Sequence, residues 1–523
     1  MCPTKGIGQS KREEWLMATL YKELIKYSQS DYYPFHMPGG KRNPKLMETG
    51  LPYHLDITEI EGFDDLHHSV GMIKELERRA SKVYNSDETA LLVNGSTSGL
   101  LGGMMACTNK GEKILVGRNS HKSIYHGIFL NELEAVYLYP EYDEELDCLL
   151  GINPKDVEDA LKENPDIKAV VITSPTFEGV VSDVEEIGRV AHQKGIPLIV
   201  DEAHGAHFGF SDGFPANSNT LGGDLVIHSV HKTLPSLTQT ALIHKNGNLV
   251  DWNKVKFYLQ IFQSSSPSYI LMSSIDVCIS ILEEEEKREK YFGEYESRLR
   301  KARERIKECS KLKLVESEHF DPSKILISGK KAKRTGLELY QVLLEKYHLQ
   351  MEMATGFTVL AMTSIADTDE GLERLVNALK EMDSERDIGE STARKKKSNE
   401  AKQESEKKSE LELKTERNHE TEIVSSWEFP RLEHVHNISN SLSREIEPKK
   451  VLPFEECADS ISKEFVYLYP PGSPLIVPGE RICKKAVEIL LQYERLGYKI
   501  KGVRESGRVE VFVSEEAKPK RSL

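Results

Sequence analysis

The feature that most constrains the fold of this chain is an alternation of short apolar runs with helix-like segments between residues 87 and 245. Each apolar run has the length of a strand, and the segments between the runs are long enough for helices. The apolar runs lie at 89–93, 113–116, 135–139, 168–173, 197–202, 224–229 and 240–245, and helices are expected at 97–108, 121–132, 155–163 and 184–194. This alternation predicts a large α/β domain with a mostly parallel, seven-stranded sheet covered by helices.

The remaining sequence predicts smaller units around this α/β domain. Residues 269–308 are rich in Glu, Lys and Arg, and we expect a long helical stretch that leaves the sheet domain. Residues 386–424 are crowded with charge and hold hardly any apolar side chain, so a disordered or loosely helical insert is expected. The expected divisions are an N-terminal segment at 1–85, the large domain at 86–310, a small α+β domain at 311–385, the insert at 386–424 and a smaller C-terminal domain at 425–523.

Composition and charge argue against several classes of protein. The 523 residues are 38% hydrophobic and 29% charged, which is typical of a globular protein. The 70 Lys and Arg against 84 Asp and Glu give a net charge of −14, without the basic excess of nucleic-acid binders. No apolar stretch predicts a membrane span, and the N-terminus becomes charged where a signal peptide would be apolar, so we expect a cytoplasmic protein. The seven cysteines are scattered singly, which predicts free thiols and no metal site.

The segment 94–99, Asn-Gly-Ser-Thr-Ser-Gly, follows one apolar run and opens a predicted helix. Glycine permits a tight turn, hydroxyl groups can donate hydrogen bonds, and a helix N-terminus offers free N–H groups to an anion. A phosphate would therefore fit at this turn. The segment matches neither the loop of nucleoside triphosphate binders nor a complete dinucleotide motif, and an ordinary turn and helix cap remains an alternative.

Three further side chains lie at strand ends or at the start of a helix in the same domain. Asp201 ends one apolar run, Lys232 follows another, and His121 opens a predicted helix. Taken alone, each has an ordinary explanation as a cap, a surface charge or a structural hydrogen-bonding group. Because ligands bind at the carboxyl ends of parallel strands, we expect these side chains to meet near the anion site. Together they provide partners for the phosphate, ring face, pyridine nitrogen and aldehyde of pyridoxal 5'-phosphate (PLP).

Several motifs along the chain resemble those of one enzyme family. The motifs are FHMPGGK (35–41), DITEIEGFDDLHH (56–68), NGSTSG (94–99), RNSHKS (118–123), TSPTFEG (173–179), DEAHGAHFGF (201–210), HSVHKTLPSLTQTA (228–241) and YPPGSPLIVPGE (469–480). They resemble the PLP-dependent Orn/Lys/Arg decarboxylases of fold type I, in the compact form found in Gram-positive bacteria. Gly40 departs from that pattern, because the family usually has His at this place, and this puts a binding duty of the first motif in doubt.

The resemblance implies a role for each candidate site residue. The catalytic group would be Lys232, which carries the cofactor covalently, His231 beside the reacting carbon, and Asp201 at the pyridine nitrogen. The other cofactor contacts would be Ser96, Thr97 and Ser229 at the phosphate, His121 stacked on the ring, and Ala203 and His204 on its other side or near the substrate carboxylate. A basic substrate also needs an acidic partner; the candidates are Glu480, Asp56 and Glu59, with Asp64 and Asp65 as further possibilities.

The activity implied by the resemblance is decarboxylation of a basic amino acid. Arginine is favoured, and lysine or ornithine is possible, so the products would be CO2 and agmatine, cadaverine or putrescine, as in polyamine biosynthesis. A homodimer or a larger homo-oligomer is expected, without a nucleic-acid or membrane partner. Two alternatives remain open. One is another PLP enzyme of fold type I, such as an aminotransferase or acyltransferase, and the other is an inactive relative that acts by binding.

Overall fold

A computed structural model describes the chain over residues 19–34, 37–38, 41, 50–385, 430–443, 448–468 and 472–513. Three features of the sequence lie outside the described residues: the insert at 386–424, the departure at Gly40 and the start of the last motif at 469–471. No helix within the described ranges combines the length and apolar character that a membrane crossing requires. The six cysteines in these ranges are free thiols, as expected.

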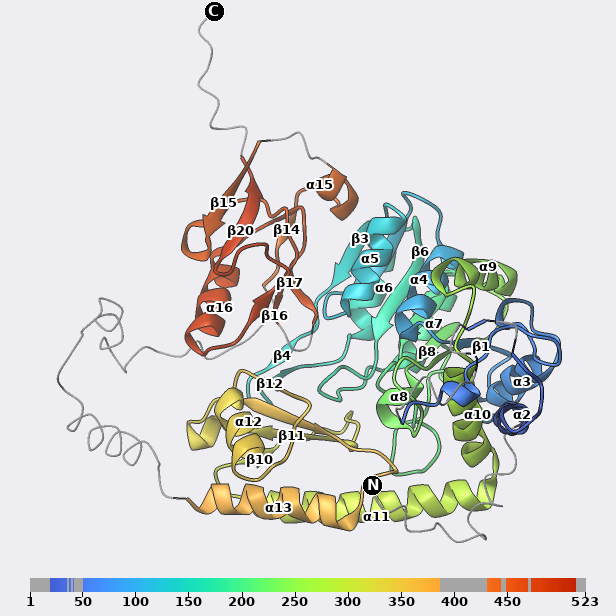
Figure 1. Cartoon of the computed structure of the whole chain (residues 1–523). Helices are drawn as coiled ribbons and strands as arrows, with labels where there is room; N and C mark the ends of the chain where they lie inside the picture. The colour runs from blue at the N-terminus through green and yellow to red at the C-terminus, as the bar shows by residue number, and fades with distance from the viewer. Residues whose placement is uncertain are drawn as a thin grey trace, which may run out of the picture.

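The centre of the molecule is a seven-stranded sheet with the strand order β1-β9-β8-β7-β6-β2-β3 (Figure 1). Strands β8, β7, β6, β2 and β3 are parallel, whereas β9 pairs antiparallel with both β8 and β1. The strands are β1 (Glu88–Leu92), β2 (Lys113–Gly117), β3 (Glu134–Leu138), β6 (Ile167–Thr173), β7 (Leu198–Asp201), β8 (Leu225–His228) and β9 (Ala241–Lys245). The mostly parallel, seven-stranded α/β architecture predicted from the apolar runs is therefore confirmed.

Helices cover both faces of this sheet. Alternate strand residues point to opposite sides, and because both sets are apolar, each face must be buried. One core contains α4, α5 and α9 with residues such as Val116 and Ile227, and the other contains α6 and α7 with Leu115 and Val226. The helices are α4 (Gly95–Cys107), α5 (Lys122–Leu130), α6 (Pro154–Glu163), α7 (Val184–His192) and α9 (Trp252–Phe262), with the short α8 (Val230–Thr233) after β8. The four helices expected between the apolar runs are all present.

The stretch expected to be helical over 269–308 is helical, but it consists of two helices. Helix α10 (Tyr269–Glu283) ends at Glu284, whose backbone is extended at φ −85° and ψ 102°, and α11 (Glu285–Lys307) follows. Arg79 of α3 (Met72–Tyr84) binds Asp276 and Glu283 and holds α10 against the large domain. Helix α11 instead packs against α13 (Asp369–Ser384) of the next unit. The break lets the two helices pack on different parts of the molecule.

Two smaller units accompany the large sheet, below it and at the upper left in Figure 1. The first has a four-stranded antiparallel sheet, β10-β11-β13-β12, with α12 and α13, as the sequence of the small α+β unit predicted. Its remaining elements are β10 (Lys313–Leu314), β11 (Lys324–Ser328), α12 (Gly336–Glu345), β12 (Met353–Thr355) and β13 (Thr358–Met362). The second, the C-terminal unit, contains β14 (Glu433–His434), α15 (Ile438–Ser443), β15 (Lys449–Pro453), β16 (Val466–Leu468), β17 (Pro474–Ile476), β18 (Glu480–Arg481), α16 (Lys484–Arg495), β19 (Ile500–Lys501) and β20 (Arg508–Phe512).

Short elements complete the described chain. A two-stranded hairpin of β4 (Tyr142–Asp143) and β5 (Cys148–Leu149) projects from the large domain toward the two smaller units (Figure 1). The N-terminal segment contributes α2 (Thr19–Ser28) and single turns at Tyr53–Leu55 and Leu66–His68, and α2 packs on α10.

Candidate active site

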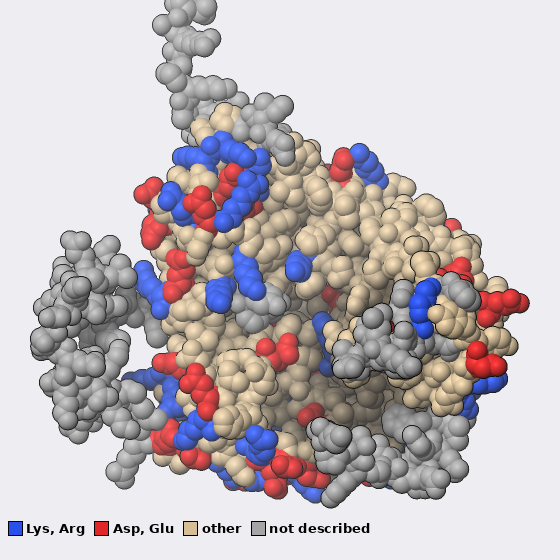
Figure 2. Space-filling view, viewed as in Figure 1, with Lys and Arg blue, Asp and Glu red and all other residues tan. Residues whose placement is uncertain are grey.

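A cavity of about 460 Å³ lies at the carboxyl ends of the parallel strands, between the large domain and the C-terminal unit. Figure 2 shows the surface hollowed near the centre of the view, below the Lys and Arg side chains of the C-terminal unit. Six of the residues selected from the sequence line this one cavity: Ser96, His121, Asp201, Ala203, His204 and Lys232. They come from β7 and from the segments that follow β1, β2, β7 and β8, so strand ends bring together residues that are far apart in the chain.

Lys232 reaches the cavity from α8, directly after β8. Its Nζ lies 3.0 Å from Nε2 of His204. Burial lowers the pKa of this ammonium, although the nearby carboxylate of Asp201 opposes the shift. A lower pKa makes the neutral amine more accessible, and the neutral amine is the nucleophilic form.

Asp201 ends β7, and its carboxylate is buried. Its Oδ1 accepts a hydrogen bond of 3.2 Å from the backbone N–H of Ala203. Burial raises the pKa of this carboxyl, and the ammonium of Lys232 acts in the opposite direction. A carboxylate in such a place can hold a proton on a ring nitrogen of a ligand, because it lacks water to compete for that proton.

An anion-binding arrangement lies where α4 begins. Gly95 has a left-handed φ of 73°, which lets the chain turn sharply from β1 into the helix. The Gly95 N–H donates to the backbone carbonyl of Gln239 at 2.9 Å, but Asn94 at the N-cap makes no side-chain hydrogen bond to the helix, so the next N–H groups of the first turn are left for a ligand. The Ser229 hydroxyl donates a 2.9 Å hydrogen bond to the Ser96 hydroxyl, which lines the cavity. Thr97 is exposed in the same first turn.

Two histidine rings lie beside Lys232. His121 caps the N-terminus of α5, where its Nδ1 accepts from the backbone N–H of Ser123 at 3.3 Å. Burial first, and then the charge of Lys232, lowers the pKa of His121 to about 4, so its ring is neutral at physiological pH. Burial and Lys232 also lower the pKa of His204 well below its ordinary value, and its ring packs 4.7 Å from that of Phe177. Neutral rings of this kind can stack on a flat cofactor.

Other candidates take different places from those expected. His231 donates from Nδ1 to the backbone carbonyl of Thr240 at 2.8 Å. Over the described part of the chain, the lining of the cavity does not include His231, Thr97, Ser229, Asp56, Glu59 or Glu480. The Asp64 carboxylate accepts a hydrogen bond from the backbone N–H of Gly71, and the Asp65 carboxylate accepts one from the backbone N–H of His67. The structure therefore leaves the acidic partner of a basic substrate to other residues.

Glu480 is the clearest departure, because it is fully buried in an ion pair with Arg118. The two side chains meet at 3.0 Å, and the Glu480 carboxylate also accepts from the backbone N–H of Val477. Arg118 in addition donates to the backbone carbonyls of Pro474 and Leu475. The expectation that Glu480 contacts substrate is corrected: an internal arginine takes up its carboxylate and joins the C-terminal unit to the large domain.

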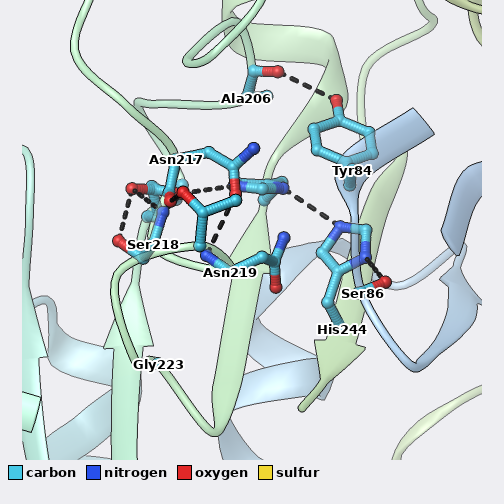
Figure 3. A network of polar contacts seen from close by, with 12 residues as sticks. Tyr84, Ser86, Ala206, Asn217, Ser218, Asn219, Gly223 and His244 are labelled. Atoms are coloured by element: carbon cyan, nitrogen blue, oxygen red, sulfur yellow. Dashed lines mark hydrogen bonds and ion pairs between the residues drawn. The ribbon is translucent and has the colours of Figure 1, made fainter. Parts of the chain in front are cut away.

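A buried polar network follows Asp201 in the chain, and Figure 3 shows the part of it around Ser218 and His244. Glu202, next to Asp201, accepts from Nε2 of His228 at 2.6 Å, and Nδ1 of His228 lies 3.1 Å from Nε2 of His244. Nδ1 of His244 lies 2.8 Å from the hydroxyl of Thr89. This chain of contacts crosses the ends of β7, β8, β9 and β1, and it connects the backbone that carries Asp201 to the backbone that carries Ser229.

Several lining residues were not selected from the sequence. Asn119 and Phe177 lie within quoted motifs, so proximity to candidate residues could have suggested them. Tyr467, Ser473 and Lys501 come from the C-terminal unit, more than 200 residues away from Lys232 along the chain; Ser473 lies within the quoted motif 469–480, whereas no local pattern marked Tyr467 or Lys501.

The residues present fit PLP, which this fold family implies. The open N-terminus of α4 with Ser96 and Ser229 fits a phosphate, and Asp201 fits the pyridine nitrogen. Lys232 supplies an amine with a lowered pKa in the same cavity. These partners are the ones a PLP site requires, and they converge on one space large enough for cofactor and substrate.

Comparison with known proteins agrees with this arrangement. Residues 18–350 match the Orn/Lys/Arg decarboxylase major domain, and residues 430–505 match the C-terminal domain of the same family. The uncharacterized protein YaaO of Bacillus subtilis is 31% identical over 516 residues, which cover 95% of this chain and 99% of that protein. An arginine decarboxylase of Bacillus subtilis is 30% identical over 519 residues, which cover 95% of this chain and 98% of that protein.

Solved structures show the same fold. The Francisella novicida lysine decarboxylase LdcF has a TM-score of 0.78 at 18% identity, over 96% of this chain and 82% of that chain. The constitutive lysine decarboxylase of E. coli has a TM-score of 0.77 at 18% identity, over 96% of this chain and 83% of that chain. The expected fold, that of fold-type-I PLP enzymes, is confirmed. The chain thus belongs to the Orn/Lys/Arg decarboxylases and is an enzyme of this amino-acid decarboxylase family.

Proposed function

We propose that this enzyme uses PLP to decarboxylate a basic amino acid, with arginine as the favoured substrate. The observation that carries the proposal is the convergence of Lys232, Asp201 and the open N-terminus of α4 on one cavity. An amine, a buried carboxylate and an anion site are the partners that this cofactor requires. Arginine is favoured because a protein named arginine decarboxylase is 30% identical over nearly the whole chain.

Each residue of the cavity would have a separate role in the reaction. PLP, when bound, supplies an electron sink that favours loss of CO2 from the α-carbon of the substrate. Asp201 would hold a proton at the pyridine nitrogen, and Ser96, to which the Ser229 hydroxyl donates, would hold the phosphate. Lys232 would carry the cofactor and afterwards deliver a proton from its Nζ, which His204 orients at 3.0 Å. The C-terminal unit contributes Tyr467, Ser473 and Lys501 to the wall of the cavity.

The test is an assay of the purified, PLP-loaded protein with arginine, lysine and ornithine. We expect release of CO2 and agmatine from arginine, with slower reaction of the other two amino acids. Lys232→Ala should lose the visible absorbance of the bound cofactor and at least about a thousandfold of the activity, because the attachment point is removed. Lys194→Ala, an exposed lysine of the same domain, is the matched control.

The same assay separates the alternatives. A keto acid in place of CO2 would favour an aminotransferase and contradict the proposed reaction. A colourless protein that forms neither product would favour a relative that acts by binding. We also propose a cytoplasmic homodimer or larger homo-oligomer. The exposed apolar side chains of Phe257 and Ile261, one turn apart on α9, support association, because monomers seldom leave large apolar side chains grouped on the surface.

A further inference from the structure

A second, smaller cavity lies next to the one that contains Lys232. It measures about 130 Å³, and Asn119, Phe177 and Ser473 line both cavities. A water molecule takes about 30 Å³ in the liquid, so this space suits a group of several heavy atoms rather than a whole amino acid. The hairpin β4–β5, the turn after β6, the end of β12 and the elements β16, β17 and α16 enclose it, and they meet at the centre left of Figure 1.

Asp147, in the turn of the β4–β5 hairpin, brings a buried carboxylate to this cavity. Its side chain is 2% exposed, and its Oδ1 accepts from the Tyr142 hydroxyl. Its Oδ2 is buried without a hydrogen-bond partner among the described residues, although Asp147 lines the cavity. Lys330 lies 4.0 Å from Oδ1, but its half-exposed ammonium donates to the backbone carbonyl of Glu144 at 3.1 Å. Because an unpartnered buried carboxylate oxygen is costly, a ligand that donates hydrogen bonds would stabilise it.

Glu178 brings a second carboxylate to the same cavity. No ion pair joins it to another residue in the described ranges, and its side-chain partner is Thr176. Burial raises the pKa of both Glu178 and Asp147. Burial also raises the pKa of the Tyr493 hydroxyl, and the nearby charges of Asp147 and Glu178 raise it further. Both carboxylates therefore lie near Tyr493, which lines the cavity as they do.

The rest of this lining suits a cation that carries an apolar stem. The rings of Tyr142, Phe177 and Tyr493 contribute to the wall, and aromatic faces attract cations. A guanidinium has five N–H donors in a plane and matches carboxylate acceptors, and it is also weakly hydrated, so its burial costs less than that of an ammonium. Phe177 and Asn119 line both cavities, so the two spaces lie side by side along these residues.

We propose that the Asp147–Glu178 cavity binds the cationic end group of the substrate, an assignment that rests on the function proposed above. The α-amino end of the same molecule then lies at Lys232 in the larger cavity. Asp147 and Glu178 would then have the role expected for Glu480, the acidic partner of the substrate side chain, because the Glu480 carboxylate is paired with Arg118. The substrate class is an amino acid with a guanidinium or ammonium group at the end of a flexible side chain.

The test compares Asp147→Asn and Glu178→Gln with Glu145→Gln, an exposed glutamate of the same hairpin loop. In the PLP-loaded enzyme, each of the first two should raise the KM for arginine about tenfold or more, because a charge-assisted contact is lost. Both should keep the cofactor absorbance and the melting temperature of the wild type. Both substitutions should also reduce the ratio of kcat/KM for arginine to kcat/KM for citrulline, the neutral isostere of arginine. A purely structural role of the two carboxylates would not change this ratio.

Binding of agmatine to the loaded enzyme, measured by calorimetry, separates this inference from the proposed function. If the wild type decarboxylates arginine but both variants match Glu145→Gln in KM and in citrulline discrimination, the cavity assignment is overturned and the reaction stands. If agmatine binds without competing with arginine, the cavity is a separate site and the assignment also fails. If no basic amino acid reacts, yet agmatine binds and both variants weaken that binding at least about tenfold, the cation site stands without the proposed reaction.

Discussion

Single ionisable side chains in this enzyme have properties set by burial. His121 and His204 lie beside Lys232, and burial together with the ammonium charge favours the neutral form of both rings. For Asp201 the two influences oppose each other: burial raises the pKa of its carboxyl group, and the positive charge of Lys232 lowers it. The chemistry of the cavity is therefore decided by which side chains water cannot reach.

His121 makes a measurable prediction about pH. The folded protein holds its pKa near 4, against an ordinary value of 6.5, so the unfolded chain binds this proton first when the pH falls. Acidification from pH 6.5 to pH 4 should therefore remove up to about 3 kcal/mol of stability through this residue. The melting temperature of His121→Gln should fall less steeply over that range than the melting temperature of the wild type. The exposed His319→Gln serves as control, and parallel curves for wild type and His121→Gln would contradict this view.

At the scale of elements, the buried network in Figure 3 holds the strand ends in register. Glu202 accepts from His228 and from the hydroxyl and backbone N–H of Ser218. Burial and the neighbouring His228 lower the pKa of His244 well below its ordinary value, so His244 is neutral. If His228 is neutral, one arrangement satisfies both rings: Thr89 donates to His244, His244 donates to His228, and His228 donates to Glu202.

His244→Phe tests this network. Phenylalanine keeps a ring beside Tyr84, whose ring lies 4.7 Å from that of His244, but it removes the partner of the His228 Nδ1. An unsatisfied buried polar atom costs about 1–3 kcal/mol, so the melting temperature should fall. Loss of PLP on dialysis should be faster, because β7 and β8 carry Asp201 and lead into Ser229. Melting and cofactor retention equal to those of the exposed-site control His319→Phe would count against a positioning role.

At the scale of the whole molecule, Arg118 joins the large domain to the C-terminal unit. Its guanidinium is buried 5.5 Å from the rings of Tyr125 and Tyr137, and it contacts Glu480 and two backbone carbonyls of the other unit. The same unit supplies Tyr467, Ser473 and Lys501 to the cavity. The cavity therefore depends on how the two units are held together.

Glu480→Gln should weaken this attachment. It leaves the buried guanidinium of Arg118 without a countercharge, and breaking one side of a buried ion pair costs about 3–5 kcal/mol. We expect a lower melting temperature, faster proteolysis between the units and reduced decarboxylation. Glu433→Gln breaks the exposed Glu433–Arg481 pair of the same unit and should cost at most about 1 kcal/mol. Equal effects of the two substitutions would show that burial of the Arg118 pair is not what matters.

The sequence by itself determined the α/β architecture, because strand and helix periodicity is a local property of the chain. It also predicted that Asp201 and Lys232 lie at strand ends, and parallel pairing then placed both at one edge of the sheet. The break at Glu284 was missed, because a charged helical pattern does not reveal that its two halves pack on different units.

Only the tertiary structure decided which acidic side chains are available to a ligand. Glu480 lies in a family-like motif, yet Arg118, 362 residues away along the chain, occupies its carboxylate. Asp147 shows no sequence signal, yet the packing of the hairpin between three units leaves one of its oxygens buried and unpartnered. Ion pairing and burial depend on contacts between distant segments, so local patterns cannot predict them.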